Sequence, residues 1–390
     1  MNNEVFVYVV CGTKEHLDTL QLSLSFLKKY SKNDVYVLTD SARNEFAISH
    51  SHIIDIQTPA HLNHHQASIF LKTGIHNYLP KGNTYCYLDT DVVAVSTDCD
   101  DIFSEFIAPI RFAPDHCKVR KFSSYAVNCN CLLNREIDRN KFQQFMQDIN
   151  GVTITEPHLL AHAKELQYEF DQLKKSFIKR AITALRFLLS YPVFKFNSSF
   201  QYHKKTRTWH IQSGEVIMYE MDIAKMQHAT GLTYNKWNKK WYNKQGEDIW
   251  HDECDHLIGY IKNTFDIEVK EENWQHWNGG VFLFNNKSHE FLDAWHQKTM
   301  HIFTLKDWKT RDQGTLIATA WEFGLANHPT LSKRFNFIAD YYNNGLQINP
   351  TTSQITDDGF EHSYSPAMVH VYHHWEDKTW NIWQWIETKI

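Results

Sequence analysis

The chain has 390 residues, a formal net charge of −5, a charged fraction of 22% and a hydrophobic fraction of 42%. This length suffices for one large domain with insertions or for two domains, and the composition excludes wholesale disorder. The negative net charge excludes a general nucleic-acid binder, because such a protein needs a basic surface. The 13 Trp, 18 Tyr and 25 Phe residues suit both a packed core and stacking on sugar rings or bases.

The seven cysteines are odd in number and form no Cys-x-x-Cys pair, which predicts a reducing compartment. The N-terminus leads directly into a predicted strand, without the basic and apolar regions of a signal peptide. No apolar run reaches the ~18–20 residues that a membrane-spanning helix needs. We therefore expect a cytoplasmic protein.

The N-terminal third alternates strands with helices. Strands are predicted at 4–11, 34–38 and 52–56, because these runs are rich in β-branched and aromatic residues. Helices are predicted at 17–30 and 64–79 from the spacing of their apolar residues. This order predicts an α/β fold with parallel strands, and ligand sites in such folds lie at the carboxyl ends of the strands.

A fourth apolar strand at 83–95 contains two carboxylates one residue apart, Asp89 and Asp91. A strand interior has no use for paired charges, and hard divalent cations bind carboxylate oxygens. The pattern therefore predicts a cation that holds a phosphate-bearing ligand, with an Asp-rich turn as the alternative.

The middle of the chain, 117–273, is predicted to be an elaboration of the core. Residues 157–189 have the apolar spacing of one long helix. The segment 174–196 mixes basic with apolar side chains, which favours either contact with an anionic membrane surface or a packed helix with solvated charges. Residues 232–250 suggest a hairpin around Gln245-Gly246.

The sequence His-Asp-Glu-Cys-Asp-His at 251–256 pairs histidines with aspartates at a spacing of four residues. This spacing is compatible with a second metal site. The alternative places the acidic residues in the first turn of the following helix, where the helix dipole favours them.

Three further motifs follow in the last third of the chain. They are a strand with Asn-Gly-Gly at 277–285, a helix opened by Asp-Gln at 311–320, and a strand running into histidines, a lysine and a tryptophan at 368–380. With the Asp-x-Asp strand, this ordered set resembles the GT-A glycosyltransferases. It is most similar to glycosyltransferase family 8, the glycogenin and lipopolysaccharide galactosyltransferase family, and its ending resembles family 32. The resemblance covers roughly 4–115 and 275–380.

The resemblance implies a GT-A mixed sheet flanked by helices, with a large mostly helical insertion. The two halves of this core would be 1–116, which binds the nucleotide sugar, and 274–390, which completes the metal site; 117–273 would form the acceptor side. The implied activity moves a sugar from a nucleotide-diphosphate sugar, expected to be a UDP-sugar, to a glycan or glycolipid with retention of configuration. Membrane contact would be peripheral, through 174–196.

The resemblance also implies a Mn²⁺ or Mg²⁺ ion that bridges the diphosphate and acts as a Lewis acid. Its ligands would be Asp89, Asp91 and a C-terminal histidine. His373 has a spacing to the following lysine close to that of the family but one residue short, so His370 and His374 remain alternatives.

The remaining implied residues contact the donor. They are Val10, Cys11, Gly12 and Thr13 at the base and ribose; Lys72 and Lys378 at the phosphates; Gly279, Asp115 and the catalytic residues Asn278, Asp312 and Gln313 at the sugar. A surface lysine is the alternative for Lys72, and a simple helix cap is the alternative for Asp312.

Two other classes compete with this interpretation. The Asp89 motif also fits the nucleophile motif of haloacid dehalogenase-type phosphatases, in which Asp89 would be phosphorylated. That class needs the motif on its first strand and a later acidic pair, and neither is present. A sugar-binding protein without catalysis would not need the metal strand, the Asp-Gln helix and the terminal histidines together. A sugar-nucleotide pyrophosphorylase is excluded, because 11–16 lacks a glycine-rich, arginine-containing phosphate loop.

Overall fold

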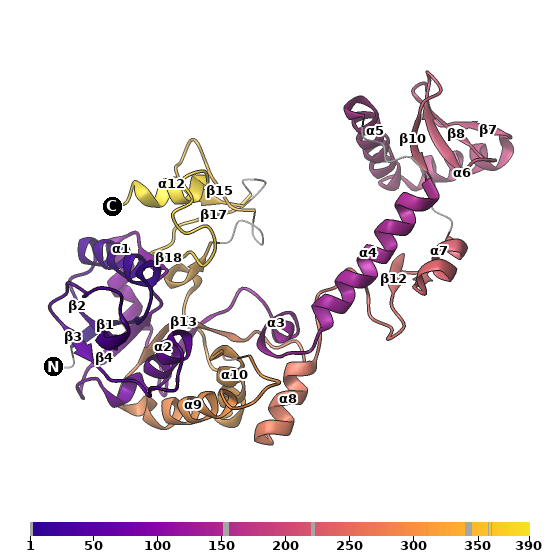
Figure 1. Cartoon of the computed structure of the whole chain (residues 1–390). Helices are drawn as coiled ribbons and strands as arrows, with labels where there is room; N and C mark the ends of the chain where they lie inside the picture. The colour runs from indigo at the N-terminus through magenta and orange to yellow at the C-terminus, as the bar shows by residue number, and fades with distance from the viewer. Residues whose placement is uncertain are drawn as a thin grey trace. The chain divides into compact units, whose positions relative to one another are not determined.

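The computed structural model describes residues 3–150, 156–219, 223–309, 311–339, 345–357, 359 and 361–390. The chain forms two compact units (Figure 1). Unit 1 comprises Met1–Cys129 and Glu253–Ile390, and unit 2 is the insertion Asn130–Asp252. The insertion is therefore shorter at both ends than the expected 117–273.

Unit 1 is built on a six-stranded sheet with the order β3-β2-β1-β4-β13-β6. Its strands are β1 (Glu4–Val9), β2 (Asp34–Thr39), β3 (Ile53–Asp55), β4 (Thr84–Leu88), β6 (Arg111–Pro114) and β13 (Trp277–Phe284). Strands β1 to β4 are parallel, whereas β13 is antiparallel to both of its neighbours. The mixed sheet confirms the predicted α/β class.

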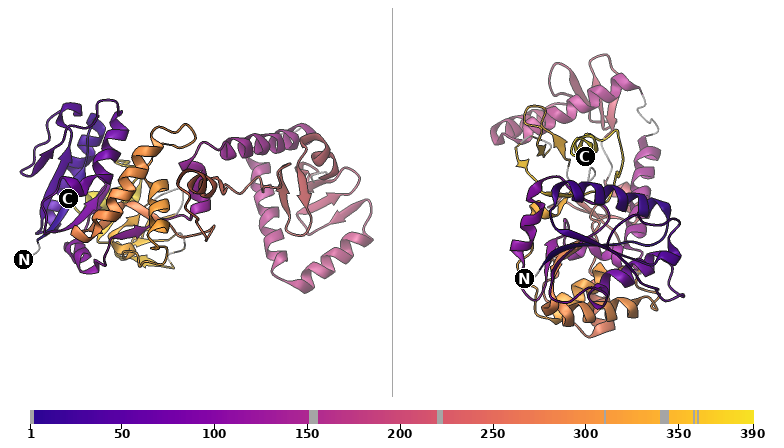
Figure 2. Two further views of the ribbon diagram at one scale, coloured as in Figure 1. Left: turned by 90° about the horizontal axis from the view of Figure 1, so that it is seen from below. Right: turned by 90° about the vertical axis from the view of Figure 1, so that its left-hand side faces the viewer.

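Helices cover both faces of this sheet, because its central strands are apolar on both sides. Along β1, Val5 and Val7 enter one core and Phe6 and Tyr8 enter the other. The Phe6 side packs against α1 (Lys14–Tyr30) and the 3-10 helix Thr97–Glu105. The Val5 side packs against α2 (His64–Thr73), α3 (Val119–Ala126), α8 (His256–Phe265), α9 (His289–Ile302) and α10 (Gln313–Glu322). Figure 2 shows the indigo helix α1 and the orange helices on opposite sides of the sheet.

A second, three-stranded sheet joins the C-terminal segment to the chain just after β4. It consists of β5 (Val92–Ala94), β14 (Phe337–Ile338) and β18 (Met368–His370). Strand β18 runs antiparallel to β5 and places His370 opposite Val92. The helix α12 (Asn381–Glu387) and the small sheet of β15 (Gln347–Ile348), β16 (Ile355–Thr356) and β17 (Ser363–Tyr364) complete this part.

Unit 2 contains four helices and two sheets within the residues described. The helices are α4 (Cys131–Asn150), α5 (Pro157–Lys174), α6 (Phe177–Leu189) and α7 (Ile223–Thr230). One sheet contains β7 (Val193–Lys195), β8 (Phe200–His203), β9 (Thr208–Ile211) and β10 (Val216–Tyr219), and the other pairs β11 (Thr233–Asn235) with β12 (Lys240–Tyr242).

Two expectations for the middle of the chain need correction. The helix expected at 157–189 is two helices, because Ser176 caps the start of α6 with its side chain. The hairpin expected around Gln245-Gly246 turns instead at 236–239, although an isolated bridge between Tyr242 and Asp248 flanks the glycine. The regular structure of the insertion is mostly helical, as expected, because its four helices contain more residues than its six described strands. No described helix is long and apolar enough to cross a membrane.

Candidate active site

Asp89 and Asp91 occupy the short turn between β4 and β5, and backbone hydrogen bonds hold this turn on three sides. The Asp89 N–H donates to the Gly280 carbonyl of β13 at 2.8 Å, and the Val92 N–H donates to the Asp89 carbonyl at 3.1 Å. The Val371 N–H, just after β18, donates to the Asp91 carbonyl at 2.9 Å. Two sheets therefore meet at the two carboxylates.

One C-terminal histidine lies beside this pair, as predicted, and it is His370. Ligand atoms of Asp89, Asp91 and His370 all lie within 4.8 Å of one another. His370 is 5% exposed, and its Nε2 lies 3.3 Å from Asp91 Oδ1. His373 lies beyond the end of β18 and is exposed, and His374 Nδ1 bonds Asp377. The geometry therefore favours His370 over His373 as the third ligand.

The chemistry of this group fits a divalent cation. Its three donors are two carboxylates and one imidazole, a mixed set that suits Mn²⁺ better than Mg²⁺, which prefers oxygen alone. Asp91 Oδ1 is buried and, apart from the ion-pair contact with His370 Nε2, has no hydrogen-bond partner among the described residues. The other His370 nitrogen, Nδ1, bonds Asn336 Oδ1 at 2.9 Å, which leaves Nε2 directed at the carboxylates. Such a partner behind a histidine is usual at metal sites.

Lys72 on α2 is a buried cation that links two of the predicted carboxylates. Its ammonium lies 2.9 Å from Asp312 Oδ2 and 3.2 Å from Asp89 Oδ1. Burial disfavours the charged form, but Asp312 and Asp89 outweigh it and raise the pKa of Lys72 above its usual range. At 8% exposure Lys72 is not a surface lysine. Asp312 stands at the N-cap of α10 but makes no side-chain capping bond, which excludes a simple capping role.

Asp115, directly after β6, accepts hydrogen bonds from two amide side chains of the site. Its Oδ2 accepts hydrogen bonds from Asn278 Nδ2 at 3.0 Å and from Gln313 Nε2 at 2.9 Å. Burial opposes ionisation of Asp115, but His276 and His116 hold its pKa well below the usual range. Asp115 is therefore an ionised carboxylate that fixes two amide side chains.

The Asn-Gly-Gly segment of β13 forms an irregularity against β6, between Asn278 and Phe282. Such bulges re-aim side chains near functional sites. Asn278 Oδ1 accepts from the Gly280 N–H at 2.8 Å and from Asn336 Nδ2 at 3.2 Å. Because its oxygen and its amide group are both engaged within the protein, Asn278 positions its neighbours.

These residues face one cavity of about 500 Å³. The predicted residues that line it are Lys72, Asp89, Asp91, Asp115, Asn278, Gly279, Asp312, Gln313, His370 and His373. The lining residues that sequence reasoning missed include His116, Lys121, Tyr125, Arg311 and Tyr372. Arg311 alone had a signal, its position next to Asp312. Asn336, which holds His370, had none, because a lone asparagine in a loop has no recognisable spacing.

The other predicted donor residues lie outside the lining of this cavity. Val10 and Cys11 follow β1 and are buried, and the Gly12 N–H donates to Asn44 Oδ1 at 3.1 Å. Thr13 is the N-cap residue of α1. Lys378 is exposed in the turn before α12. The structure thus brings together the predicted metal and sugar residues in one cavity but does not extend that cavity to the predicted base and ribose residues.

No protein-family model matches the chain, and no curated protein matches it. Solved structures do. The galactosyltransferase LgtC, in complex with donor and acceptor sugar analogues, matches with a TM-score of 0.41 and 10% identity over 99% of this chain and 95% of its own. Mouse xyloside xylosyltransferase 1 has a TM-score of 0.36 and 13% identity over 95% and 97% of the two chains. The bifunctional glycosyltransferase WbbM has a TM-score of 0.37 and 10% identity over 95% of this chain and 45% of its own.

All three are glycosyltransferases, the class that the sequence motifs resemble.

Proposed function

We propose that the protein is a divalent-cation-dependent glycosyltransferase that uses a nucleotide-diphosphate sugar, with UDP as the expected nucleotide, and a glycan or glycolipid acceptor. The observation that carries this proposal is the convergence of three ligands, Asp89, Asp91 and His370, within 4.8 Å in a cavity that Asp312 and Gln313 also line. A cavity of about 500 Å³ falls in the size range of small-molecule sites.

The charges in the cavity support a requirement for a cation. Four aspartates line it, namely Asp89, Asp91, Asp115 and Asp312, together with three basic residues, Lys72, Lys121 and Arg311. A diphosphate placed next to Asp89 and Asp91 would meet repulsion from these two carboxylates, and a cation between them would remove it. A cation held by Asp89, Asp91 and His370 would neutralise the charge that develops on the departing nucleotide diphosphate.

Residues of the chain itself would then position the sugar next to the cation. Gln313 is fixed through its Nε2 to Asp115, which leaves Oε1 for a ligand at the sugar. Lys72 holds Asp312 Oδ2 from one side, at 2.9 Å. Asp115, which accepts a hydrogen bond from Gln313, is engaged by two amides and two histidines and is a poor nucleophile. The proposal includes retention by attack on the same face of the sugar, with Gln313 beside the reacting carbon, as the resemblance to family 8 implies.

The structure gives no support to the phosphatase alternative. The Asp89 motif follows the fourth strand in chain order rather than the first. Lys72 and Tyr87 both bind Asp89 Oδ1, at 3.2 Å and 2.5 Å, and these contacts weaken a nucleophile.

The test is hydrolysis and transfer from a panel of nucleotide sugars with Mn²⁺. We expect slow donor hydrolysis that Asp91→Asn abolishes and that the matched variant Asp101→Asn, at an exposed aspartate, leaves unchanged. The anomeric configuration of the product, read by NMR, tests retention. Phosphomonoester hydrolysis without a response to any nucleotide sugar would refute the proposal and favour the phosphatase.

We also propose that helix α6 contacts an anionic membrane surface, which would suit a glycolipid acceptor. No residue of α6 is buried, and its apolar side chains are strongly exposed: Phe177 by 77%, Ile178 by 70%, Leu188 by 75% and Leu189 by 79%. Exposed basic residues lie at the N-terminal end of α6, beside Phe177 and Ile178, namely Lys174, Lys175, Lys179 and Arg180. Apolar and basic side chains together match the chemistry of an anionic lipid surface.

Co-sedimentation with vesicles tests this contact. We expect binding to vesicles that contain phosphatidylglycerol, weaker binding to neutral phosphatidylcholine vesicles, and about tenfold weaker binding of the Leu188→Ser/Leu189→Ser variant. The control is Leu133→Ser, at a leucine that is 55% exposed on α4. Equal binding of the double variant and the control would contradict the proposal.

A further inference from the structure

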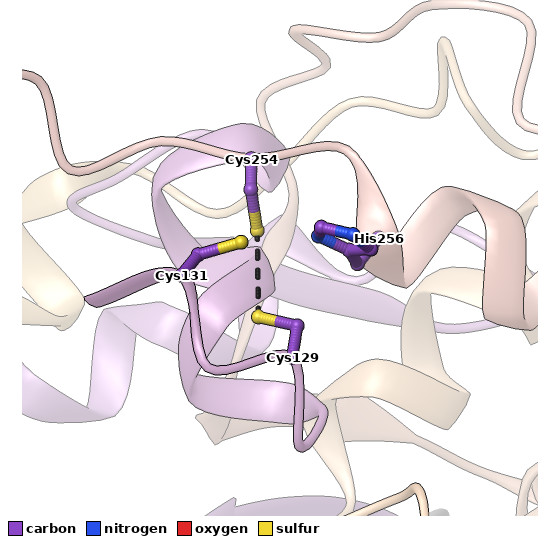
Figure 3. Close-up of side chains that lie close together, drawn as sticks. All are labelled: Cys129, Cys131, Cys254 and His256. Atoms are coloured by element: carbon purple, nitrogen blue, oxygen red, sulfur yellow. Dashed lines mark hydrogen bonds between the residues drawn. The ribbon is translucent and has the colours of Figure 1, made fainter. Parts of the chain in front are cut away.

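A cluster of sulfur and nitrogen ligands lies away from the candidate active site. Cys129 and Cys131 form a Cys-x-Cys motif at the start of α4, and Cys254 and His256 form a Cys-x-His motif at the start of α8. Figure 3 shows the four side chains directed toward one another. Their ligand atoms all lie within 4.8 Å of one another.

We propose that Cys129, Cys131, Cys254 and His256 form a structural zinc site. Cys129, Cys254 and His256 belong to unit 1. Cys131 follows Cys129 by two residues, so its Cα can lie no more than about 7 Å from that of Cys129. The cluster therefore depends on local chain geometry around the end of unit 1.

The distances fit a tetrahedral ion. With Zn–S bonds of about 2.3 Å, two thiolates on a tetrahedral zinc lie about 3.8 Å apart. The Cys129 and Cys254 sulfurs are 3.8 Å apart. A disulfide would need about 2.05 Å, so the geometry is that of two ligands around an ion.

The donor types and their surroundings also point to zinc. Three thiolates and one imidazole select Zn²⁺, whereas the carboxylates of the cavity select a harder cation. Cys131 and Cys254 are each 5% exposed, while His256 is exposed and gives an ion access from solvent. The Cys254 thiol donates to the Ser123 hydroxyl oxygen at 3.2 Å, and this oxygen also accepts from the Leu257 N–H, so the hydroxyl proton can turn to the sulfur once Cys254 is a thiolate.

The position of the site explains its role. Cys129 and Cys254 are 125 residues apart in the chain and bracket the insertion. An ion there cross-links the segment that leaves unit 1 to the segment that returns, and clips that close long loops stabilise most in principle. Binding to three thiols and a neutral imidazole releases three thiol protons to solvent, so uptake weakens as the pH falls.

Metal content of the full-length chain, purified with a reductant, tests the proposal. We expect about one zinc per chain in the wild type and in Cys99→Ala, which removes a buried cysteine elsewhere in unit 1, and less than a tenth of that in Cys129→Ala/Cys254→Ala. Cobalt replacement should give thiolate-to-cobalt charge-transfer absorption in the wild type and the control only. Mn²⁺ affinity should stay the same in all three proteins, because the cavity has separate ligands.

A second pair of variants covers the case in which the double variant does not fold. His256→Gln changes an exposed residue at a helix start, and we expect at least tenfold weaker zinc binding than in His251→Gln, an exposed neighbour outside the cluster. A reduced wild-type chain that takes up no zinc, a Cys129–Cys254 disulfide found by peptide mapping, or zinc retained by His256→Gln at wild-type affinity would each overturn the proposal.

Discussion

Replacing Gly280 with alanine should weaken cation binding strongly. A Cβ at Gly280 would lie 2.5 Å from His370 Cε1 and 2.9 Å from both Asp89 Oδ2 and Asn278 Oδ1. The first distance falls about 0.9 Å short of the 3.4 Å at which ordinary contact begins. Metal sites tolerate ligand shifts of only about 0.2 Å. Two ligands must therefore move by several times this tolerance.

We expect cation affinity to fall at least tenfold, about 1.4 kcal/mol, with overpacking costing about 1–3 kcal/mol of stability. Titration with Mn²⁺, followed by EPR or calorimetry, measures the affinity. At Gly279 the nearest atoms to a Cβ are Lys72 Nζ at 3.3 Å and Asp312 Oδ2 at 3.4 Å, so Gly279→Ala should keep its Mn²⁺ affinity. Gly259→Ala, in α8 with no atom within 4 Å of a Cβ, controls for the substitution itself. Wild-type Mn²⁺ affinity in Gly280→Ala would refute the assignment of the ligands.

Three further predictions concern buried charges. Lys72→Met leaves Asp312 without its cation, so the free energy of unfolding in urea without Mn²⁺ should fall by about 3 kcal/mol, and unchanged stability would contradict the buried ion pair. Asp115→Asn loosens Gln313, so kcat should fall at least about tenfold while Mn²⁺ affinity holds; parallel loss of both would assign Asp115 to the metal instead. Burial lowers the pKa of His296 to about 4. Below pH 6.5 the unfolded chain therefore binds one proton more than the folded chain, and the free energy of unfolding should fall by roughly 2–3 kcal/mol as the pH drops toward 4. Denaturation at pH 7 and at pH 4.5 should show a smaller drop for His296→Gln than for the wild type.

The sequence was sufficient for the parts of the fold and site that local patterns encode. The apolar run before Asp89 and Asp91 predicted the buried strand β4. Because a buried strand excludes paired charges, the two aspartates marked the end of the strand and a ligand site. Asp312 and Gln313 were predicted from the opening of α10. The cavity that joins these elements agrees with the predicted order of motifs.

The choice of histidine could not be made from spacing. Which histidine meets Asp91 depends on where β18 ends and on its pairing with β5, and the strand ends at His370. His373 lies in the turn beyond it. A tertiary pairing between 92–94 and 368–370 has no signature in either segment alone.

The cysteine cluster was missed for a related reason. Its ligands come as two short pairs that are 125 residues apart, and α3, through the Ser123 side chain, holds the second pair next to the first. The motif at 251–256 did suggest a metal, but its acids serve ion pairs instead. Asp255 binds Arg120 at 2.8 Å, and Asp252 binds Arg139. Its acids also precede α8, which begins at His256, rather than forming its first turn.

The chain leaves unit 1 after Cys129 and rejoins it at Glu253, and the sulfurs that bracket this excursion are 3.8 Å apart. Because the two segments that connect the insertion to unit 1 lie next to each other, insertions of very different size can be accommodated without altering the core of unit 1. Unit 1 keeps Asp89, Asp91, His370, Asp312 and Gln313 entirely within itself. The insertion can therefore be exchanged as a module without changing these cavity-lining residues of unit 1.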